Sequence, residues 1–231
     1  MLNIQYLGHS CFMLDDGTHR LLFDPFISGN PMAEAIDIKS LMPHYILVSH
    51  GHGDHIGDSV EIAHQSNAKI ICNYEVGQWL HKRGITQTHE VNYGGKLNFD
   101  FGFVKIVNAV HSSMLPDETY GGNPLGFLIN IAGKNIYYAG DTGLTMDMKL
   151  IPLWCKLDVA ILPLGNTFTM DIDDAVIASN FIECNEIIGM HYDTFQPIKI
   201  NHEEARQKFA DAGKKLKLLW VGESIKVDSG Q

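Results

Sequence analysis

The chain has 231 residues, 45% of them hydrophobic and 19% charged, which suits one folded α/β domain and excludes a disordered or collagen-like polymer. Lys and Arg total 17 against 27 Asp and Glu, so the net charge of −10 disfavours non-specific binding to nucleic acid. There is no apolar run of membrane-spanning length and no leader-like start, so we expect a cytoplasmic protein that does not contact a membrane. The four scattered cysteines predict reduced, buried thiols.

Short apolar runs bounded by Gly, Asp, Asn and Pro recur along the chain and predict β-strands. The predicted strands cover residues 2–7, 20–23, 45–48, 69–72, 103–109, 125–131, 135–139, 158–162 and 187–190. Two of these runs flank an Ala-Gly-Lys segment, which predicts a tight antiparallel hairpin at 132–134. Phe99, Phe101 and Phe103 alternate at strand period, which predicts one face of a single packed strand.

Segments with helical spacing lie between the strands and predict helices over residues 60–65, 76–82 and 172–181. Asp171 is placed to cap the third of these helices. Asn201 followed by Glu204 resembles a capping box, and Gly213 stands where the helix that begins there should end. Because strands and helices alternate without a linker, we predict a single domain over residues 1–231.

The most informative segment is Ser-His-Gly-His-Gly-Asp-His, which directly follows a predicted strand. It places His50, His52, Asp54 and His55 within six positions. Imidazole and carboxylate groups suit Zn, Mn or Fe, and the two glycines let the backbone turn so that these side chains converge. A lone histidine is more often a structural residue, but four ligand-type residues at this spacing favour a metal site.

Three other residues of ligand type stand at the end of a predicted strand: His111, Asp141 and His191. Each one alone fits an ordinary polar residue at a strand end equally well. Together with the His-rich motif they give seven candidate ligands, five of them histidines and two aspartates.

The motif His-x-His-x-Asp-His, followed by His111, Asp141 and His191 in that order, resembles the dinuclear site of the metallo-β-lactamase superfamily. Leu-Gly-His-Ser near the start, Phe-Thr-Met at 168–170 and His-Tyr-Asp-Thr at 191–194 resemble its branch of small metal-dependent hydrolases related to sugar-phosphate lactonases. The resemblance extends over nearly the entire sequence. It implies a four-layer αββα sandwich of the α/β (α+β) class, with two mixed sheets face to face and helices outside.

The resemblance also implies which residues would bind the metals. The first ion would be held by His50, His52 and His111, the second by Asp54, His55 and His191, and Asp141 would bridge them. The expected cofactors are two divalent ions about 3.5 to 4 Å apart, with zinc as first choice and manganese or iron as alternatives. Such a pair lowers the pKa of a bridging water to roughly 7, so we expect hydroxide to attack a small ester, lactone or phosphorylated metabolite. Asp54 would have a second, catalytic role in holding or relaying the proton toward the leaving group.

Three further polar residues are candidates for the surroundings of the ligands. Asp24 and Asp193 are placed to accept hydrogen bonds from ligand imidazoles, although turn capping explains them equally well. The resemblance implies that His9 lies near the metals, where it could contact substrate, and the alternative is a structural histidine. The Gly-Gly-Asn-Pro turn at 121–124 could form a rim over the site or a simple bend.

Differences from other branches of the superfamily narrow the function. Antibiotic-hydrolysing members have a Cys where this chain has Asp141, and flavodiiron-like members have a Glu where it has His52. Two alternatives stay open, a metal-dependent nuclease or phosphodiesterase and a non-catalytic metal-binding scaffold. The expected partner is a small-molecule substrate, nucleic acid is disfavoured by charge, and a homo-oligomer stays open.

Overall fold

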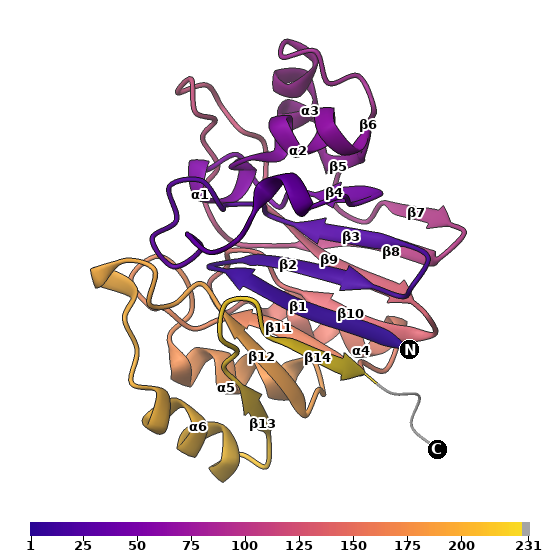
Figure 1. Cartoon of the computed structure of the whole chain (residues 1–231). Coiled ribbons are helices and arrows are strands. Elements are labelled where there is room, and N and C mark those ends of the chain that lie inside the picture. The colour runs from indigo at the N-terminus through magenta and orange to yellow at the C-terminus, as the bar shows by residue number, and fades with distance from the viewer. Residues whose placement is uncertain (228–231) are drawn as a thin grey trace.

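The computed structural model describes residues 1–227, whose strands form two seven-stranded sheets (Figure 1). Sheet A has the order β14 (Ser224–Val227), β1 (Leu2–Gly8), β2 (Cys11–Asp15), β3 (Arg20–Phe23), β4 (Tyr45–Leu47), β5 (Lys69–Asn73) and β6 (Thr88–Val91). Sheet B has the order β13 (Lys215–Lys217), β12 (Glu186–Met190), β11 (Val159–Pro163), β10 (Lys134–Tyr138), β9 (Leu125–Ile131), β8 (Gly102–Asn108) and β7 (Lys96–Phe99).

The two sheets repeat the same pairing pattern. In sheet A the strands from β14 to β3 pair antiparallel and those from β3 to β6 pair parallel. In sheet B the strands from β7 to β10 pair antiparallel and those from β10 to β13 pair parallel. Because β8 and β10 both pair antiparallel with β9, they run in the same direction and end at the same edge of the sheet.

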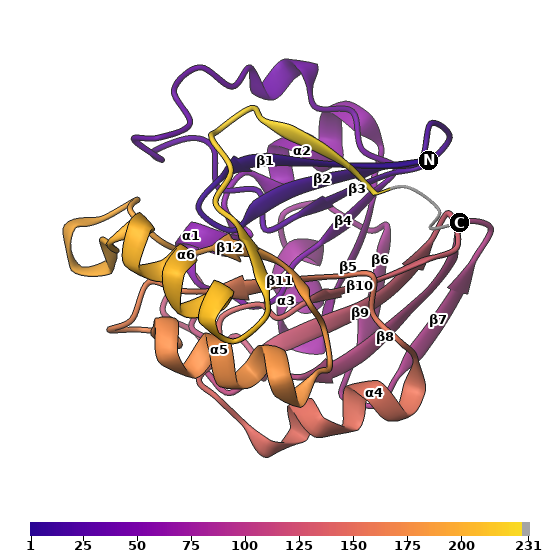
Figure 2. The same ribbon diagram turned by 90° about the horizontal axis from the view of Figure 1, so that it is seen from below.

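Helices cover the outer faces of both sheets, which gives the predicted αββα sandwich (Figure 2). Sheet A is covered by α2 (Ser59–Ser66) and α3 (Tyr74–His81). Sheet B is covered by α4 (Ile151–Trp154), α5 (Ile172–Phe181) and α6 (His202–Asp211). The remaining elements are short: α1 (Gly53–Ile56) and the 3₁₀ helices η1 (Ile38–Ser40), η2 (Met146–Leu150) and η3 (Gln196–Ile198). Within residues 1–227, no helix has the length and apolar character needed to cross a bilayer.

Alternating side chains divide each central strand between two apolar layers. On β3, Leu21 and Phe23 join the core between the sheets, whereas Leu22 joins the layer beneath α2 and α3. The Phe23 ring packs 4.9 Å from that of Tyr138 on β10, so aromatic contacts join the two sheets. Strands buried on both faces require continuous apolar runs, which is why these runs were visible in the sequence.

The predicted helix ends are confirmed in atomic detail. The Asp171 side chain accepts from the Asp174 backbone N–H, and the Asn201 side chain accepts from two backbone N–H groups at the start of α6. The predicted hairpin also forms, and its two central residues, Ala132 and Gly133, have φ values of 51° and 73°. This conformation suits a two-residue turn between twisted strands.

The prediction of one strand through the three alternating phenylalanines is wrong. β7 ends at Phe99 and β8 begins at Gly102, so a turn separates the rings. The Phe99 and Phe101 rings stack at 4.8 Å, whereas Phe103 packs beneath the Lys96 ammonium on the paired strand. Gly102 has a φ of 140° and lies against the Asn130 carbonyl, a close approach that ends the extended run.

Candidate metal centre

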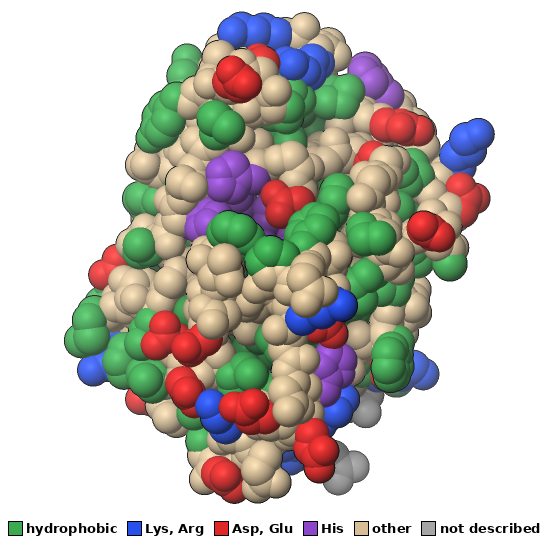
Figure 3. Space-filling view, turned by 90° about the vertical axis from the view of Figure 1, so that its left-hand side faces the viewer, with side chains coloured by type: hydrophobic (Ala, Val, Ile, Leu, Met, Phe, Trp, Pro, Cys, Tyr) green, Lys and Arg blue, Asp and Glu red, His purple; other side chains and the backbone are tan. Residues whose placement is uncertain are grey.

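The candidate ligands gather at one end of the sandwich because each follows the carboxyl end of a strand. The His-rich motif follows β4 and continues into α1, while the other three residues follow β8, β10 and β12. Figure 3 shows histidine side chains together in one patch on this end of the molecule, beside acidic and hydrophobic side chains. The structure brings together His50, His52, Asp54, His55, His111, Asp141 and His191.

These residues form three overlapping groups in which one ligand atom from each residue lies within 4.8 Å of the others. One group combines His50, His52 and His111. The second combines His55 and Asp141 with His50, and the third is formed by His9, Asp54, His55 and His191. His9 therefore stands beside the candidate ligands, as expected from the sequence.

Asp141 occupies the middle of the cluster. Its Oδ2 atom lies 3.0 Å from His191 Nε2, 3.2 Å from His55 Nε2 and 3.6 Å from His111 Nε2. Among the described residues, the buried Asp141 Oδ1 and His55 Nε2 atoms have no hydrogen-bond partner. Buried polar atoms without a partner are rare in native proteins and call for an ion or another ligand.

Asp24 positions two imidazoles, that of His55 directly and that of His50 through Ser49. Its carboxylate accepts from the Ser49 backbone N–H at 2.7 Å, the Ser49 hydroxyl at 2.6 Å, His55 Nδ1 at 2.8 Å and the Tyr138 hydroxyl at 2.7 Å. Because the Ser49 hydroxyl donates to Asp24, it accepts from His50 Nδ1, which lies 2.9 Å away. In their neutral form, both imidazoles thus carry the proton on Nδ1 and present the Nε2 lone pair to the cluster.

Ser49 and Tyr138 were not singled out by the sequence. Ser49 directly precedes His50, so its position in the motif was a signal that could have identified it. Tyr138 had no such signal, because its hydroxyl reaches Asp24 across the space between the two sheets. Thr194 was also missed as a partner of His9, with its hydroxyl 2.9 Å from His9 Nδ1.

Helix α1 is held against the segment that follows β3. The Asp58 backbone N–H donates to the Pro25 carbonyl at 2.8 Å, and the Asp58 carboxylate accepts from the backbone of Ile27 and Ser28. Gly57, with a φ of 33°, makes this contact possible, since a Cβ atom there would lie 2.3 Å from the Pro25 oxygen. The His55 imidazole of α1 is thereby fixed next to Asp24.

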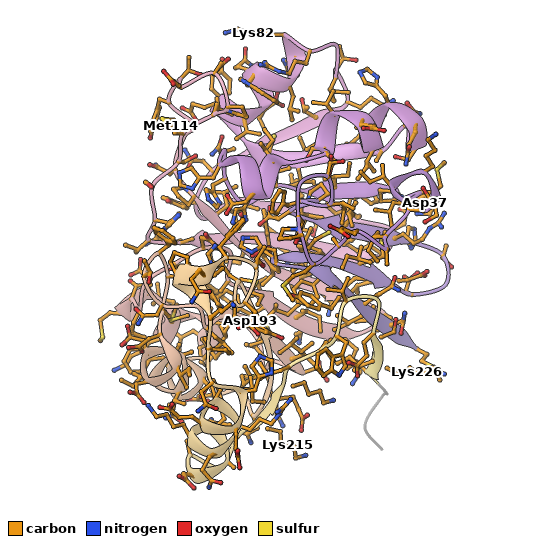
Figure 4. The ribbon with its side chains drawn as sticks, turned by 60° about the vertical axis from the view of Figure 1, so that its left-hand side comes forward. Asp37, Lys82, Met114, Asp193, Lys215 and Lys226 are labelled. Carbon is orange, nitrogen blue, oxygen red and sulfur yellow. The ribbon has the colours of Figure 1, made fainter. Side chains whose placement is uncertain are left out.

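One of the residues expected beside the ligands, Asp193, lies elsewhere. Asp193 pairs with His202 Nε2 at 2.6 Å and accepts from the Ile200 backbone, so it does not support an imidazole of the cluster as expected. Its backbone, with a φ of 61°, turns the side chain toward the start of α6. Figure 4 labels Asp193 and, on the loop between β8 and β9, Met114.

The Gly-Gly-Asn-Pro turn at 121–124 packs against α3. The Asn73 amide donates to the carbonyls of Gly121 and Asn123 at 2.7 and 3.1 Å. A different part of the same loop contacts the His-rich motif, since the Ser113 hydroxyl accepts from the Gly51 N–H at 3.0 Å. The loop is thus fixed at both points.

Burial and neighbouring charges set the protonation of the free cluster. Burial lowers the pKa of His50 far below its usual value, and it also lowers the pKa of His52 and His111. Burial opposes a charge on His55 as well, but the carboxylates of Asp141 and Asp24 outweigh it and raise the pKa of His55. The pKa of Asp141, in contrast, is lowered although burial acts to raise it, because His191 and His55 stabilise the ionised carboxylate.

The donor set fits divalent cations. Neutral imidazole nitrogens and carboxylate oxygens are the ligands of Zn, Mn and Fe sites, and the partnerless Asp141 Oδ1 and His55 Nε2 are free to coordinate. His55 Nε2 and Asp141 Oδ2 face each other as two acceptors at 3.2 Å when His55 is neutral. Such a pair needs a proton or a cation nearby.

Two facing mixed sheets with a His- and Asp-rich centre at the strand ends define the class of metal-dependent hydrolases with the metallo-β-lactamase fold. A family model for a β-lactamase superfamily domain matches residues 19–219. The chain is 55% identical over 226 residues to a UPF0173 metal-dependent hydrolase from Flavobacterium johnsoniae, which covers 98% of this chain and 100% of that protein. The chain therefore belongs to the β-lactamase superfamily and, within it, to the UPF0173 metal-dependent hydrolases.

Other relatives agree with this placement. A UPF0173 metal-dependent hydrolase from Christiangramia forsetii is 51% identical over 98% of this chain and 100% of its own length. Among solved structures, the chain is similar to Igni18, a metallo hydrolase from Ignicoccus hospitalis, with a TM-score of 0.87, 33% identity and 97% coverage of both chains. The family and fold predicted from the motifs are confirmed.

Proposed function

We propose that the chain binds two divalent metal ions and uses them to hydrolyse a small ester, lactone or phosphorylated metabolite. The facing acceptors His55 Nε2 and Asp141 Oδ2, with the partnerless Asp141 Oδ1 beside them, carry this proposal. Two buried acceptors this close together, with the His55 imidazole held by Asp24, are arranged for a cation between them.

The proposed ligand assignment follows the three groups of the cluster. One ion would be held by His50, His52 and His111, which form one of these groups. The other would be held by Asp54, His55 and His191, which form another group together with His9, and Asp141 would be shared between the two ions. Divalent ions bound there would lower the pKa of a bound water and would polarise the substrate oxygen as Lewis acids. Zinc is the first choice, and manganese or iron are alternatives, because availability often decides among N/O sites.

The surrounding residues position the ligands and handle the proton. Asp24 and Ser49 keep the imidazoles of His55 and His50 in the tautomer that directs Nε2 inward. Asp54 is partly exposed, with its side chain 31% accessible, and accepts from His9 Nε2 at 3.2 Å. It is therefore placed to take a proton at Oδ2 from the attacking water and to pass it toward the leaving group.

Metal reconstitution tests the proposal. Protein stripped with a chelator is loaded with Zn, Mn or Fe and assayed against lactones, nitrophenyl esters, phosphomonoesters and bis-p-nitrophenyl phosphate, with metal content measured on the same samples. We expect two ions per chain and turnover of a carboxylic or phosphoric ester that the stripped protein does not hydrolyse.

Replacing the shared carboxylate makes the test residue-specific. Asp141→Asn is expected to lower the metal content and to reduce kcat by roughly a thousandfold, since both groups lose their common charged ligand. Asp16→Asn is the matched control, because Asp16 also pairs with a histidine, His19, but in the turn before β3. Two ions per chain without hydrolysis of any substrate would refute the enzymatic proposal in favour of a metal-binding scaffold.

A further inference from the structure

Two phenylalanine side chains stand beside the candidate metal ligands. The ring centroids of Phe26 and Phe195 lie 5.7 and 5.6 Å from that of His9, both edge-on, and 6.3 Å from each other. His9 in turn packs 4.2 Å from the His191 ring and donates to Asp54. The pair Phe26 and Phe195, here called the aromatic wall, is thus one side chain away from the cluster.

The aromatic wall is accessible from solvent. Phe195 is 38% exposed, and Phe26 is partly exposed. Asp54, on the other side of the buried His9, is also partly exposed. Phe26, Phe195 and Asp54 thus all contact His9, and all three are at least partly exposed to solvent.

Hydrogen bonds fix both rings relative to the cluster. Phe195 directly follows Thr194, whose hydroxyl bonds His9 Nδ1. The Phe26 backbone N–H donates to the Asp24 carbonyl at 2.8 Å, and Gly57 provides the space in which this segment meets α1. Because the residues that position the imidazoles also position the rings, the aromatic wall is preorganised for binding.

Among the described residues, the positive charge that acts on the cluster belongs to imidazoles and not to Lys or Arg. Within residues 1–227, no Lys or Arg forms an ion pair with a carboxylate of the cluster. The charges that shift the pKa of His9, Asp54 and Asp141 belong to other imidazoles and carboxylates. The lysines labelled in Figure 4 lie at the outer edges of the molecule.

We propose that the substrate carries an uncharged apolar or aromatic group next to its reacting carbonyl, and that Phe26 and Phe195 bind this group. The inference rests on the proposed hydrolase function and narrows it to carboxylic esters or lactones without a phosphate tail. A phosphate or carboxylate tail would need Arg, Lys or several N–H donors to replace its hydration. Phenyl rings offer it none and would instead bury an alkyl or aryl group.

Two nitrophenyl esters of matched chain length test the inference. p-Nitrophenyl butyrate ends in a methyl group, whereas the mono-p-nitrophenyl ester of succinic acid ends in a carboxylate. In the enzymatic reaction of either ester, water adds to the carbonyl carbon and the bond to nitrophenolate breaks, so no other reactant is needed. The rate without protein is subtracted for each ester, because the carboxylate of the succinate ester also attacks its own carbonyl and releases nitrophenolate. The measured quantity is the ratio of kcat/KM for the two esters in metal-loaded protein, with metal content determined for each variant.

We expect the unmodified protein to prefer butyrate at least tenfold, and Phe195→Ala to lower this preference roughly tenfold. Phe195→Leu should keep most of the preference, since it retains an apolar side chain, and Phe195→Lys should shift it toward succinate. Phe103→Ala is the matched control and should leave the ratio unchanged, because Phe103 lies near the start of β8, at the end opposite His111.

The outcomes separate the two proposals. If metal-loaded protein hydrolyses neither these esters nor any other member of the panel, the proposed function fails and the inference falls with it. If it hydrolyses the succinate ester as well as the butyrate ester, or if Phe195→Ala and Phe195→Lys leave the ratio unchanged, the inference is overturned and the hydrolase function stands.

Discussion

At the scale of single residues, Asp24 has the most demanding position. It is fully buried, has a φ of 39°, and accepts hydrogen bonds from Ser49 directly after β4, from His55 of α1 and from Tyr138 of sheet B. A buried carboxylate is tolerated only when it is fully hydrogen-bonded. Asp24 therefore couples the orientation of His55 to the packing of the two sheets.

Asp24→Asn is expected to weaken zinc binding by 10- to 100-fold and to lower the free energy of unfolding by about 3 kcal/mol. Asn tolerates the positive φ, but its NH₂ group cannot accept from the donors that surround it. Zinc affinity is measured by competition with a chromophoric chelator and stability by urea unfolding of the metal-free protein.

A milder substitution, Tyr138→Phe, keeps the test informative if Asp24→Asn does not fold. Tyr138→Phe removes a single donor to Asp24 and should cost about 1 kcal/mol with a smaller loss of affinity. Asp16→Asn, at the turn between β2 and β3, should leave zinc affinity unchanged. Unchanged zinc affinity in Asp24→Asn would show that the carboxylate does not position a ligand.

At residue level, the sequence indicated candidate ligands where the signal was local. His50, His52, Asp54 and His55 are close in the chain, and their spacing directly after an apolar strand was enough to indicate a metal site. The partners Tyr138 and Thr194 gave no such signal, because their hydroxyls meet Asp24 and His9 only after the fold brings residues 114 and 185 positions apart together. Asp193 was misjudged because proximity to His191 in sequence does not fix the direction of a side chain at positive φ.

At the scale of elements, central strands could be predicted and edge strands could not. β4, β5, β11 and β12 are buried on both faces and read as continuous apolar runs. β6, β7, β13 and β14 lie at the sheet edges with partly exposed side chains, so their sequences show no clear pattern. β2 was missed although it is buried, because its segment Cys-Phe-Met-Leu-Asp follows β1 in the sequence after only His9 and Ser10.

The four-residue helix α1 depends on the glycine that follows it. Gly57→Ala would bring a Cβ atom against the Pro25 carbonyl and force a φ of 33° on a residue with a side chain. We expect a loss of more than about 2 kcal/mol in the free energy of unfolding, together with a lower metal content, because α1 carries Asp54 and His55.

Gly133→Ala separates the clash from backbone strain. Gly133 also has positive φ, 73°, but nothing lies within 4 Å of the Cβ position, so only about 1 kcal/mol is expected and metal content should not change. Urea unfolding and metal analysis of both variants check this. Equal effects in the two variants would mean that the contact between α1 and Pro25 does not position the ligands.

At the scale of the whole molecule, the candidate metal ligands come together only when both sheets are assembled. The candidate ligands follow β4 of sheet A and β8, β10 and β12 of sheet B, and no single element holds more than part of the set. In the unfolded chain the ligand groups are far apart, so metal binds the native state preferentially. Metal binding and the stability of the sandwich are therefore linked quantities.

The dependence of the free energy of unfolding on the free metal concentration therefore reports how many ions are bound. Above the dissociation constant, each ion that binds only the native state adds about 1.4 kcal/mol to the free energy of unfolding for every tenfold rise in free metal, and two ions add about 2.7 kcal/mol. Urea unfolding at buffered free zinc concentrations should give the slope for two ions, about 2.7 kcal/mol of unfolding free energy for every tenfold rise in free zinc. Chelation of the zinc should remove this stabilisation. Asp141→Asn should reduce the slope toward that of one ion, because the carboxylate shared by the two groups is lost. A slope of about 1.4 kcal/mol in the unmodified protein at saturating zinc would contradict a dinuclear centre.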